Sequence, residues 1–175
     1  AGESSAMSVP AKKRPSPNHD VRNGAIDMIV LHYTGMTDCA GALGRLCDAA
    51  AKVSAHYLID EDGTLYALVD EARRAWHAGV ASWRGETDIN GCSIGIELVN
   101  PGHEFGCRAF PDAQMKTLEH LCADIMERHD ISAARVLGHA DVAPARKQDP
   151  GELFDWPRLA DLGLAVLPDP QPVSA

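Results

Sequence analysis

Short apolar runs separated by polar turns recur along the chain and predict β-strands. Residues 26–34 (IDMIVLHYT) are apolar and β-branched and end at Gly35, as expected of a buried strand. Residues 55–70 contain two alternating runs that meet at Asp62-Gly63, the strongest short signal for a β-hairpin. Residues 92–100 (CSIGIELVN) and 134–140 (ARVLGHA) predict two further strands.

Helical periodicity is clearest in residues 111–130. Apolar side chains recur there at steps of three and four, which is the stripe that packs a helix on a sheet: Met115, Leu118, Cys122, Ile125 and Met126. Residues 38–50, with Thr37 or Asp38 as N-cap, and residues 156–163 predict two shorter helices, whereas residues 71–91 are expected to form a loop. Strands and helices mixed in this way predict an α/β protein with one sheet covered by helices.

A chain of 175 residues fits one domain. We expect an irregular lead-in over residues 1–24, one domain over 25–165 and a loose tail over 166–175. Residues 1–6 precede Met7 and resemble a remnant of an expression vector, so Met7 is the expected natural start.

The charge and the cysteine content indicate which binding partners and which cellular compartment to expect. The net charge is −9 and no Lys/Arg run exceeds KKR, so neither nucleic acid nor an anionic membrane is an expected partner. The five cysteines are odd in number and lack a C-x-x-C pair, which favours free thiols in a reducing compartment. No apolar run approaches the roughly 20 residues of a membrane span. We therefore expect a cytoplasmic protein, or a periplasmic one if a signal peptide was trimmed.

Two histidines follow predicted strands and suggest a metal site. His32 lies at the end of the first strand, His139 at the end of the last, and Asp149 follows ten residues later on a proline-containing loop. Two histidines and one carboxylate make a catalytic zinc pattern, in which the fourth position is left for water. The residue types also allow another interpretation, with His32 as a hydrogen-bonded core residue and His139 and Asp149 as a loop ion pair.

Glu97 and Lys147 are candidates for the chemistry beside such a metal. Glu97 shares a strand face with Ser93 and Gly95, and Gly95 leaves room for a ligand or loop to approach closely. Glu97 could accept a proton from water, or could instead lie on the solvated side of a half-buried strand. Lys147 projects to the same side as Asp149 if that segment is extended, where it could stabilise an oxyanion or remain a solvated loop lysine.

Five ordered blocks carry a family resemblance. They are VSAHYLIDEDGTLY, RAWHAG, NGCSIGIELVN, GHADVAPARKQDPG and FDWPRL, and the similarity extends from about His32 to Leu159. The chain resembles the zinc-dependent, AmpD-like N-acetylmuramoyl-L-alanine amidases, which are related to phage amidases and peptidoglycan recognition proteins. The resemblance implies an α/β fold with a single mixed central β-sheet flanked by helices, and makes residues 25–165 a catalytic domain.

The resemblance also implies a site. His32, His139 and Asp149 would bind Zn²⁺, Glu97 would act as acid and base, and Lys147 would stabilise the oxyanion. Five residues would line or support the substrate groove: Tyr33, Trp76, His77, Asn90 and Ala140. We further expect an ion pair between Asp141 and Arg146 beside the metal.

The implied reaction is hydrolysis of the amide between the lactyl group of (1,6-anhydro-)N-acetylmuramic acid and L-alanine of the stem peptide. The partner would be a muropeptide or peptidoglycan fragment, with a role in cell-wall turnover and recycling, and the protein is expected to be a monomer. The alternative is a peptidoglycan-binding module of the same fold without hydrolysis.

Overall fold

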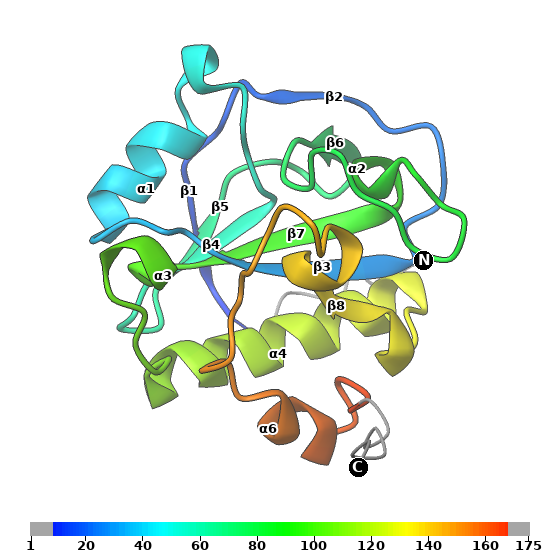
Figure 1. The fold of residues 1–175 in the computed structure, drawn as a ribbon. Coiled ribbons are helices and arrows are strands. Elements are labelled where there is room, and N and C mark those ends of the chain that lie inside the picture. Colours follow the sequence, from blue (N-terminus) through cyan, green and yellow to red (C-terminus); the bar gives the residue numbers. More distant parts are fainter. Residues whose placement is uncertain (1–8, 168–175) are drawn as a thin grey trace.

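Six strands form the central sheet, in the order β1-β5-β4-β7-β3-β8 (Figure 1). The computed structural model describes residues 9–167. The strands are β1 (Ala11–Lys13), β3 (Met28–Tyr33), β4 (Tyr57–Ile59), β5 (Leu65–Ala67), β7 (Ser93–Leu98) and β8 (Val136–Gly138). Only β4 and β5 pair antiparallel, as the predicted hairpin, and the other neighbours are parallel. The prediction of a single mixed sheet is therefore confirmed.

The two central strands, β3 and β7, are buried on both faces. Ile29 and Leu31 of β3 join Ile94 and Ile96 of β7 in the core that packs under α4 (Asp112–His129). The opposite face of β7 carries Ser93, Gly95 and Glu97, and all six residues of this strand are buried. Continuous burial is expected of inner strands in a parallel arrangement, so Glu97 does not lie on a solvated surface.

Helices cover the sheet on both sides. In Figure 1, α4 lies against one face with α6 (Trp156–Asp161) beside it, and Arg158 of α6 forms ion pairs with Asp112 and Glu119 of α4. Helix α1 (Cys39–Leu46) begins at Asp38, whose carboxylate accepts a hydrogen bond from the Gly41 N–H, as an N-cap should. The remaining short helices are α2 (Ile89–Cys92), α3 (Gly102–Phe105), α5 (His139–Val142), η1 (Ala49–Ala51) and η2 (Ala133–Arg135).

Two expectations for irregular segments are wrong. The lead-in contains β1, at the sheet edge, and β2 (His19–Val21), which pairs with β6 (Arg73–Ala75); β6 and α2 both lie in the expected loop over residues 71–91. The Arg22 guanidinium joins these pieces by donating to the carbonyl oxygens of Glu71, Arg73, Gly91 and Ser93. Three-residue edge strands need few apolar residues, so hydrophobic pattern did not reveal them. Residues 1–8 and 168–175, including most of the expected tail, lie outside the described part.

Within residues 9–167, no helix has both the length and the apolar character needed to cross a membrane. All five cysteines are free thiols, as the spacing predicted.

Candidate active site and metal centre

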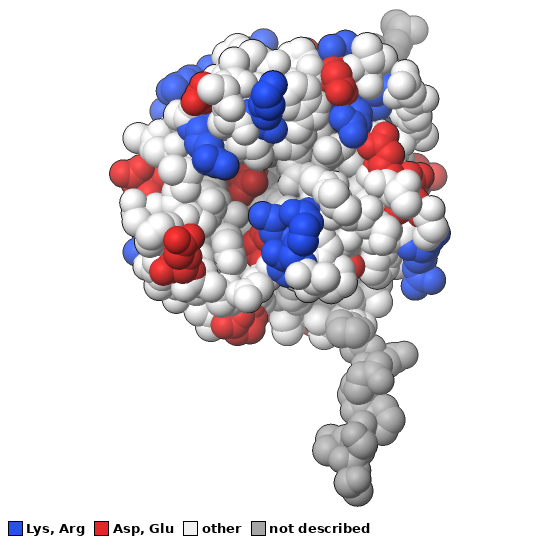
Figure 2. All heavy atoms as spheres, turned by 45° about the horizontal axis from the view of Figure 1, so that its top comes forward, with Lys and Arg blue, Asp and Glu red and all other residues white. Residues whose placement is uncertain are grey.

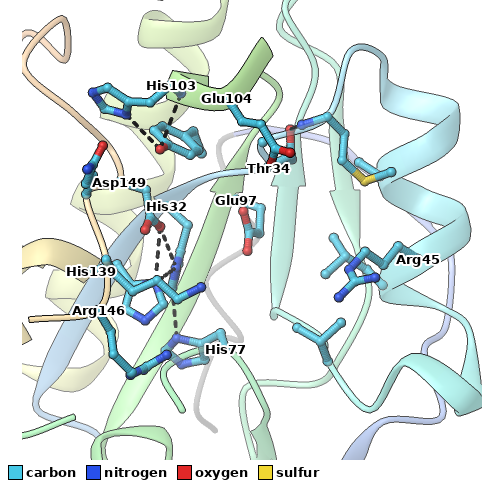
Figure 3. A pocket seen from close by; sticks show the side chains of 18 residues that line it. His32, Thr34, Arg45, His77, Glu97, His103, Glu104, His139, Arg146 and Asp149 are labelled. Carbon is cyan, nitrogen blue, oxygen red and sulfur yellow. Dashed lines mark hydrogen bonds and ion pairs between the residues drawn. The ribbon is translucent and has the colours of Figure 1, made fainter. Parts of the chain in front are cut away.

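Three buried side chains converge at the carboxyl ends of β3 and β8. His32 is in β3, His139 directly follows β8, and Asp149 returns from the next loop (Figure 3). His32 Nδ1 lies 2.9 Å from His139 Nδ1, and Asp149 Oδ2 lies 3.1 Å from each of these nitrogens. All three residues are at most 6% exposed. The sequence predicted this trio, and the fold brings it together.

The hydrogen bond at His139 Nε2 determines whether His139 Nδ1, which faces the other two residues, carries a proton. His139 Nε2 lies 2.9 Å from the Ala78 carbonyl oxygen, which can only accept, so this nitrogen carries the proton. In a neutral ring His139 Nδ1 then has a bare lone pair, directed at Asp149 and His32. Electron pairs gathered in this way repel one another unless a cation lies between them.

The donor set fits a zinc-type site. In a tetrahedral site with metal–ligand distances of about 2.0–2.1 Å, ligand atoms lie about 3.3 Å apart, close to the separations of the three atoms here. Burial lowers the pKa of His32, which keeps the imidazole neutral as a metal ligand must be. The pKa of Asp149 is held below its ordinary value although burial acts to raise it, because His139 and His32 lie against its carboxylate.

Backbone contacts hold the loop that carries Asp149. The Ala140 N–H donates to the Asp149 carbonyl oxygen at 2.9 Å, and the Asp141 carboxylate accepts from the Gly138 N–H at 2.8 Å. Arg146 donates to the carbonyl oxygens of Ala78 and Val80, both at 2.8 Å. The expected ion pair between Asp141 and Arg146 is therefore wrong, because each side chain is bound to backbone groups.

Glu97 lies beside the trio with an unpaired oxygen. It is 8% exposed, and among the described residues its Oε2 has no hydrogen-bond partner. Burial, followed by repulsion from Asp149, holds the pKa of Glu97 well above the ordinary value, while Lys147 acts in the opposite direction. Glu97 can therefore exchange a proton at pH values where an ordinary glutamate stays ionised.

Lys147 lies at the same pocket on an exposed stretch of the loop. Its backbone N–H donates to the Ala143 carbonyl oxygen at 2.9 Å. Its ammonium forms no hydrogen bond or ion pair with any residue in the described part of the chain. This cation is therefore available to a negatively charged group in the pocket.

These residues line a pocket of about 570 Å³, which opens as the hollow in Figure 2. Both basic and acidic side chains line it: Arg45, Arg146 and Lys147, and Glu97, Glu104 and Asp149. Besides Arg45, α1 and the segment after it contribute apolar side chains, namely Ala42, Leu46 and Val53. Such a mixed pocket suits an elongated ligand with both apolar and charged groups.

The expected substrate residues divide into two groups. Tyr33 lines the pocket, with its hydroxyl 2.8 Å from His103 Nδ1, and His77 lies behind His32 at the pocket floor. Trp76, Asn90 and Ala140 do not line this pocket. The Trp76 indole N–H donates to Asp20, and Asn90 Oδ1 accepts from the backbone N–H groups of His77 and Ala78.

Three ionisable side chains are among the lining residues that escaped the sequence analysis. Arg45 comes from α1, and His103 and Glu104 come from α3. All three are exposed polar residues on short helices. Such residues usually form a solvated surface, so the sequence held no signal that separates them from it.

The site has the composition expected from the resemblance, and comparison with known proteins establishes the family. The sequence model described as N-acetylmuramoyl-L-alanine amidase matches residues 22–152. The chain belongs to this family. The resemblance inferred from the five sequence blocks is therefore confirmed.

Individual relatives agree with this assignment. The N-acetylmuramoyl-L-alanine amidase AmiD of Escherichia coli K12 is 40% identical over 161 residues, which cover 85% of this chain and 57% of AmiD. The 1,6-anhydro-N-acetylmuramyl-L-alanine amidase AmpD of Haemophilus influenzae is 42% identical over 164 residues, covering 83% of this chain and 84% of AmpD. This chain thus spans little more than half of AmiD but most of AmpD.

The fold is shared as well. A solved complex of Escherichia coli AmiD with anhydro-N-acetylmuramic acid-L-Ala-D-γ-Glu-L-Lys superposes with a TM-score of 0.76 at 40% identity, covering 82% of this chain and 60% of that one. The same fold therefore holds a muropeptide in that relative.

Proposed function

We propose that this protein is a zinc-dependent N-acetylmuramoyl-L-alanine amidase. It hydrolyses the amide between the lactyl group of (1,6-anhydro-)N-acetylmuramic acid and L-alanine of the stem peptide. The observation that carries this proposal is the convergence of His32, His139 and Asp149 beside Glu97 in one pocket of an amidase-family chain. The names of AmiD and AmpD, and the muropeptide in the AmiD complex, support the same substrate class.

The chemistry divides among five side chains and the metal. Zinc held by the three ligands would supply Lewis-acid polarisation of the scissile carbonyl and make water more acidic. Glu97 takes the proton of the attacking water on its unpaired oxygen and then delivers it to the departing amine of L-alanine. Lys147 places its unpaired ammonium beside the oxyanion of the tetrahedral intermediate.

The residues assigned to the substrate groove have different parts in this proposal. Tyr33 contacts the substrate from the pocket wall. Trp76, Asn90 and Ala140 act from behind the pocket, because they form hydrogen bonds with Asp20, the 77–78 backbone and Asp149 respectively. His77 lies at the pocket floor and contacts His32. Their substitution is therefore expected to disturb the metal ligands or the loop rather than substrate contacts.

An assay of amide cleavage tests the proposal. The zinc-loaded protein is incubated with anhydro-N-acetylmuramyl tripeptide, and the released stem peptide is followed by mass spectrometry, with Glu97→Ala as the inactive comparison. Stoichiometric zinc without peptide release from the wild type would overturn the amidase and leave the non-catalytic peptidoglycan-binding module. All three ligand positions carry residues that can bind a metal, and Glu97 is buried beside them, which favours the amidase over the binding module.

The same assay addresses the natural substrate. The five free thiols favour a cytoplasmic location, where soluble anhydro-muropeptides released during recycling would be the substrates. Export to the periplasm would instead favour intact peptidoglycan. Comparing rates on soluble muropeptide and on purified sacculi separates these two settings.

A further inference from the structure

A buried chain of hydrogen-bonded groups leads from the Ile89 carbonyl to the metal ligand His32. The Ser93 hydroxyl donates to the Ile89 carbonyl oxygen at 2.6 Å, and Ser93 Oγ lies 3.1 Å from His77 Nε2. His77 Nδ1 in turn lies 3.0 Å from His32 Nε2. Ser93, His77 and His32 are 0%, 5% and 1% exposed, so water does not interrupt the chain.

Each link determines the direction of the next one. The Ile89 carbonyl can only accept, so the Ser93 proton points to it and Ser93 Oγ accepts from His77 Nε2–H. A neutral imidazole has one ring proton, so His77 Nδ1 is an acceptor and receives the proton of His32 Nε2. His32 Nδ1 is then left unprotonated and faces His139 and Asp149.

We propose that Ser93 and His77 are positioning residues that fix the His32 tautomer able to bind the metal. This inference rests on the proposed zinc function, and assigns to Ser93 a role in a site that it does not touch. Partners on the far nitrogen of a metal-binding histidine orient the ring and set its tautomer.

The surroundings of His77 are built to hold this ring. A Cβ at Gly95 would lie 2.4 Å from His77 Cγ, so the ring occupies the space that the missing side chain leaves. Asn90 accepts from the backbone N–H groups of His77, at 3.1 Å, and Ala78, at 2.8 Å. The Ala78 carbonyl oxygen accepts a hydrogen bond from His139. The 77–78 segment that Asn90 fixes therefore orients both proposed metal-binding histidines.

Substitution of Ser93 tests the relay without touching a ligand. In Ser93→Ala, the His77 ring can carry its proton on Nδ1 and donate it to His32 Nε2. A neutral His32 must then carry its own proton on Nδ1, the nitrogen that would bind the metal. We expect zinc affinity, measured by competition with a chromophoric chelator, to fall about 10- to 100-fold. Ser93→Thr keeps the hydroxyl and should restore affinity to within about threefold of wild type. Ser16→Ala, which removes another buried hydroxyl bonded to a carbonyl, should leave it unchanged.

A second measurement reads the tautomers directly. In the metal-free protein, ¹⁵N NMR shifts of the His32 and His77 rings should show Nε2–H for both in wild type and a mixture in Ser93→Ala. Unchanged zinc affinity and tautomers in a folded Ser93→Ala would overturn the relay, whereas failure of wild type to bind zinc would overturn the proposed function. If Ser93→Ala does not fold, His77→Gln, which offers an amide oxygen to His32, should bind zinc more tightly than His77→Leu; equal affinities would contradict the relay.

A different observation concerns Arg45, the remaining cation of the pocket. Arg146 is bound to backbone carbonyls, and Lys147 is assigned to the oxyanion in the proposed function. The Arg45 guanidinium has no hydrogen bond or ion pair with any residue that the structure describes. Figure 3 shows Arg45 reaching into the pocket from α1, across from the wall that carries His139 and Asp149.

The proposed substrate offers this cation a partner. In the stem L-Ala-D-γ-Glu, named for the AmiD complex, the γ-linkage leaves the α-carboxylate of D-Glu free. That carboxylate lies about 6 Å beyond the scissile nitrogen in an extended chain. We infer that Arg45 binds the D-Glu α-carboxylate and thereby selects stem peptides in which it is free, an inference that rests on the proposed amidase function.

Two substrates and two variants test this assignment. Wild type should cleave the D-Glu substrate with kcat/KM at least about tenfold above the D-isoglutamine analogue, whose carboxylate is amidated. Arg45→Gln should reduce this preference to less than about twofold. Arg14→Gln, an exposed control whose backbone contacts Cys47 at the end of α1, should retain it. Cleavage of both substrates by Arg45→Gln with the wild-type preference would contradict the role of Arg45, and a wild type that cleaves neither would contradict the amidase instead.

Discussion

His32 of β3 and Glu97 of β7 are direct partners in the parallel pairing of the two central strands. Adjacent strands lie about 4.8 Å apart, and paired residues project to the same face. The proposed metal ligand and the proposed proton carrier are therefore held side by side by the backbone pairing of the two strands. The sheet places His32 and Glu97, and the loop after β8 supplies Asp149 and Lys147.

Glu97→Gln should remove hydrolysis and keep the metal. The amide retains the volume of Glu97 but cannot carry the proton, so we expect kcat to fall by about 10² to 10⁴. Peptide release measured by mass spectrometry gives the rate, and elemental analysis gives the zinc content. Activity within tenfold of wild type in the zinc-loaded variant would assign proton transfer to another group.

Lys147→Ala should lower the rate without loss of zinc. Removing one electrostatic stabiliser of an oxyanion costs on the order of 100-fold or more in kcat. Kinetics on the anhydro-muropeptide should show the change mainly in kcat, and Lys147→Arg, which keeps a charge, should recover part of the rate. An effect confined to KM would instead indicate a role in substrate binding.

Asp149→Ala should abolish tight zinc binding. Wild type is expected to gain thermal stability with zinc, by about 2.7 kcal/mol at 100 times Kd, because the three ligand atoms meet only in the folded state. The variant should show almost no such shift in a calorimetric scan. A zinc-dependent rise in Tm equal to that of wild type would remove Asp149 from the ligand set.

Chelation should inactivate the enzyme reversibly. Dialysis against EDTA is expected to reduce amidase activity to background, and zinc at one equivalent should restore it, because the three ligands form the only cluster of its kind among the described residues. Magnesium should fail to restore activity, since it prefers oxygen ligands. Full activity in the metal-free protein would contradict the proposed chemistry.

His56 should make folding sensitive to mild acid. Burial lowers its pKa to about 4, below the value of about 6.5 for an exposed histidine. Between pH 6.5 and pH 4 the unfolded chain therefore binds more protons, and the free energy of unfolding decreases as the pH falls. His56→Gln should flatten this part of the profile, measured by urea unfolding of the metal-free protein. An unchanged slope would show that His56 does not titrate in this way.

The local pattern of hydrophobic residues was sufficient to predict the long helices and strands. The helix predicted over residues 111–130 is α4, and the apolar runs over 26–34 and 92–100 are β3 and β7. Alternation also placed Ser93, Gly95 and Glu97 on one face. These features depend on periodicity within a single element, which a sequence states directly.

Other features depend on neighbours distant in the chain. β1 and β2 have too few apolar residues to be seen alone, and they form because β5 and β6 offer partners. Whether Glu97 was solvated could not be decided from its strand, since its burial depends on what covers that face.

For the site, the residue types and ordered motifs of the sequence by themselves determined the ligand candidates His32, His139 and Asp149 and the family of the chain. Only the tertiary structure decided that these atoms lie about 3 Å apart, that His77 and Ser93 stand behind His32, and that Arg45 faces the pocket. The physical reason is that hydrogen-bond direction and burial are properties of groups brought together by folding. Ser93 and His32, for example, are 61 positions apart in the chain.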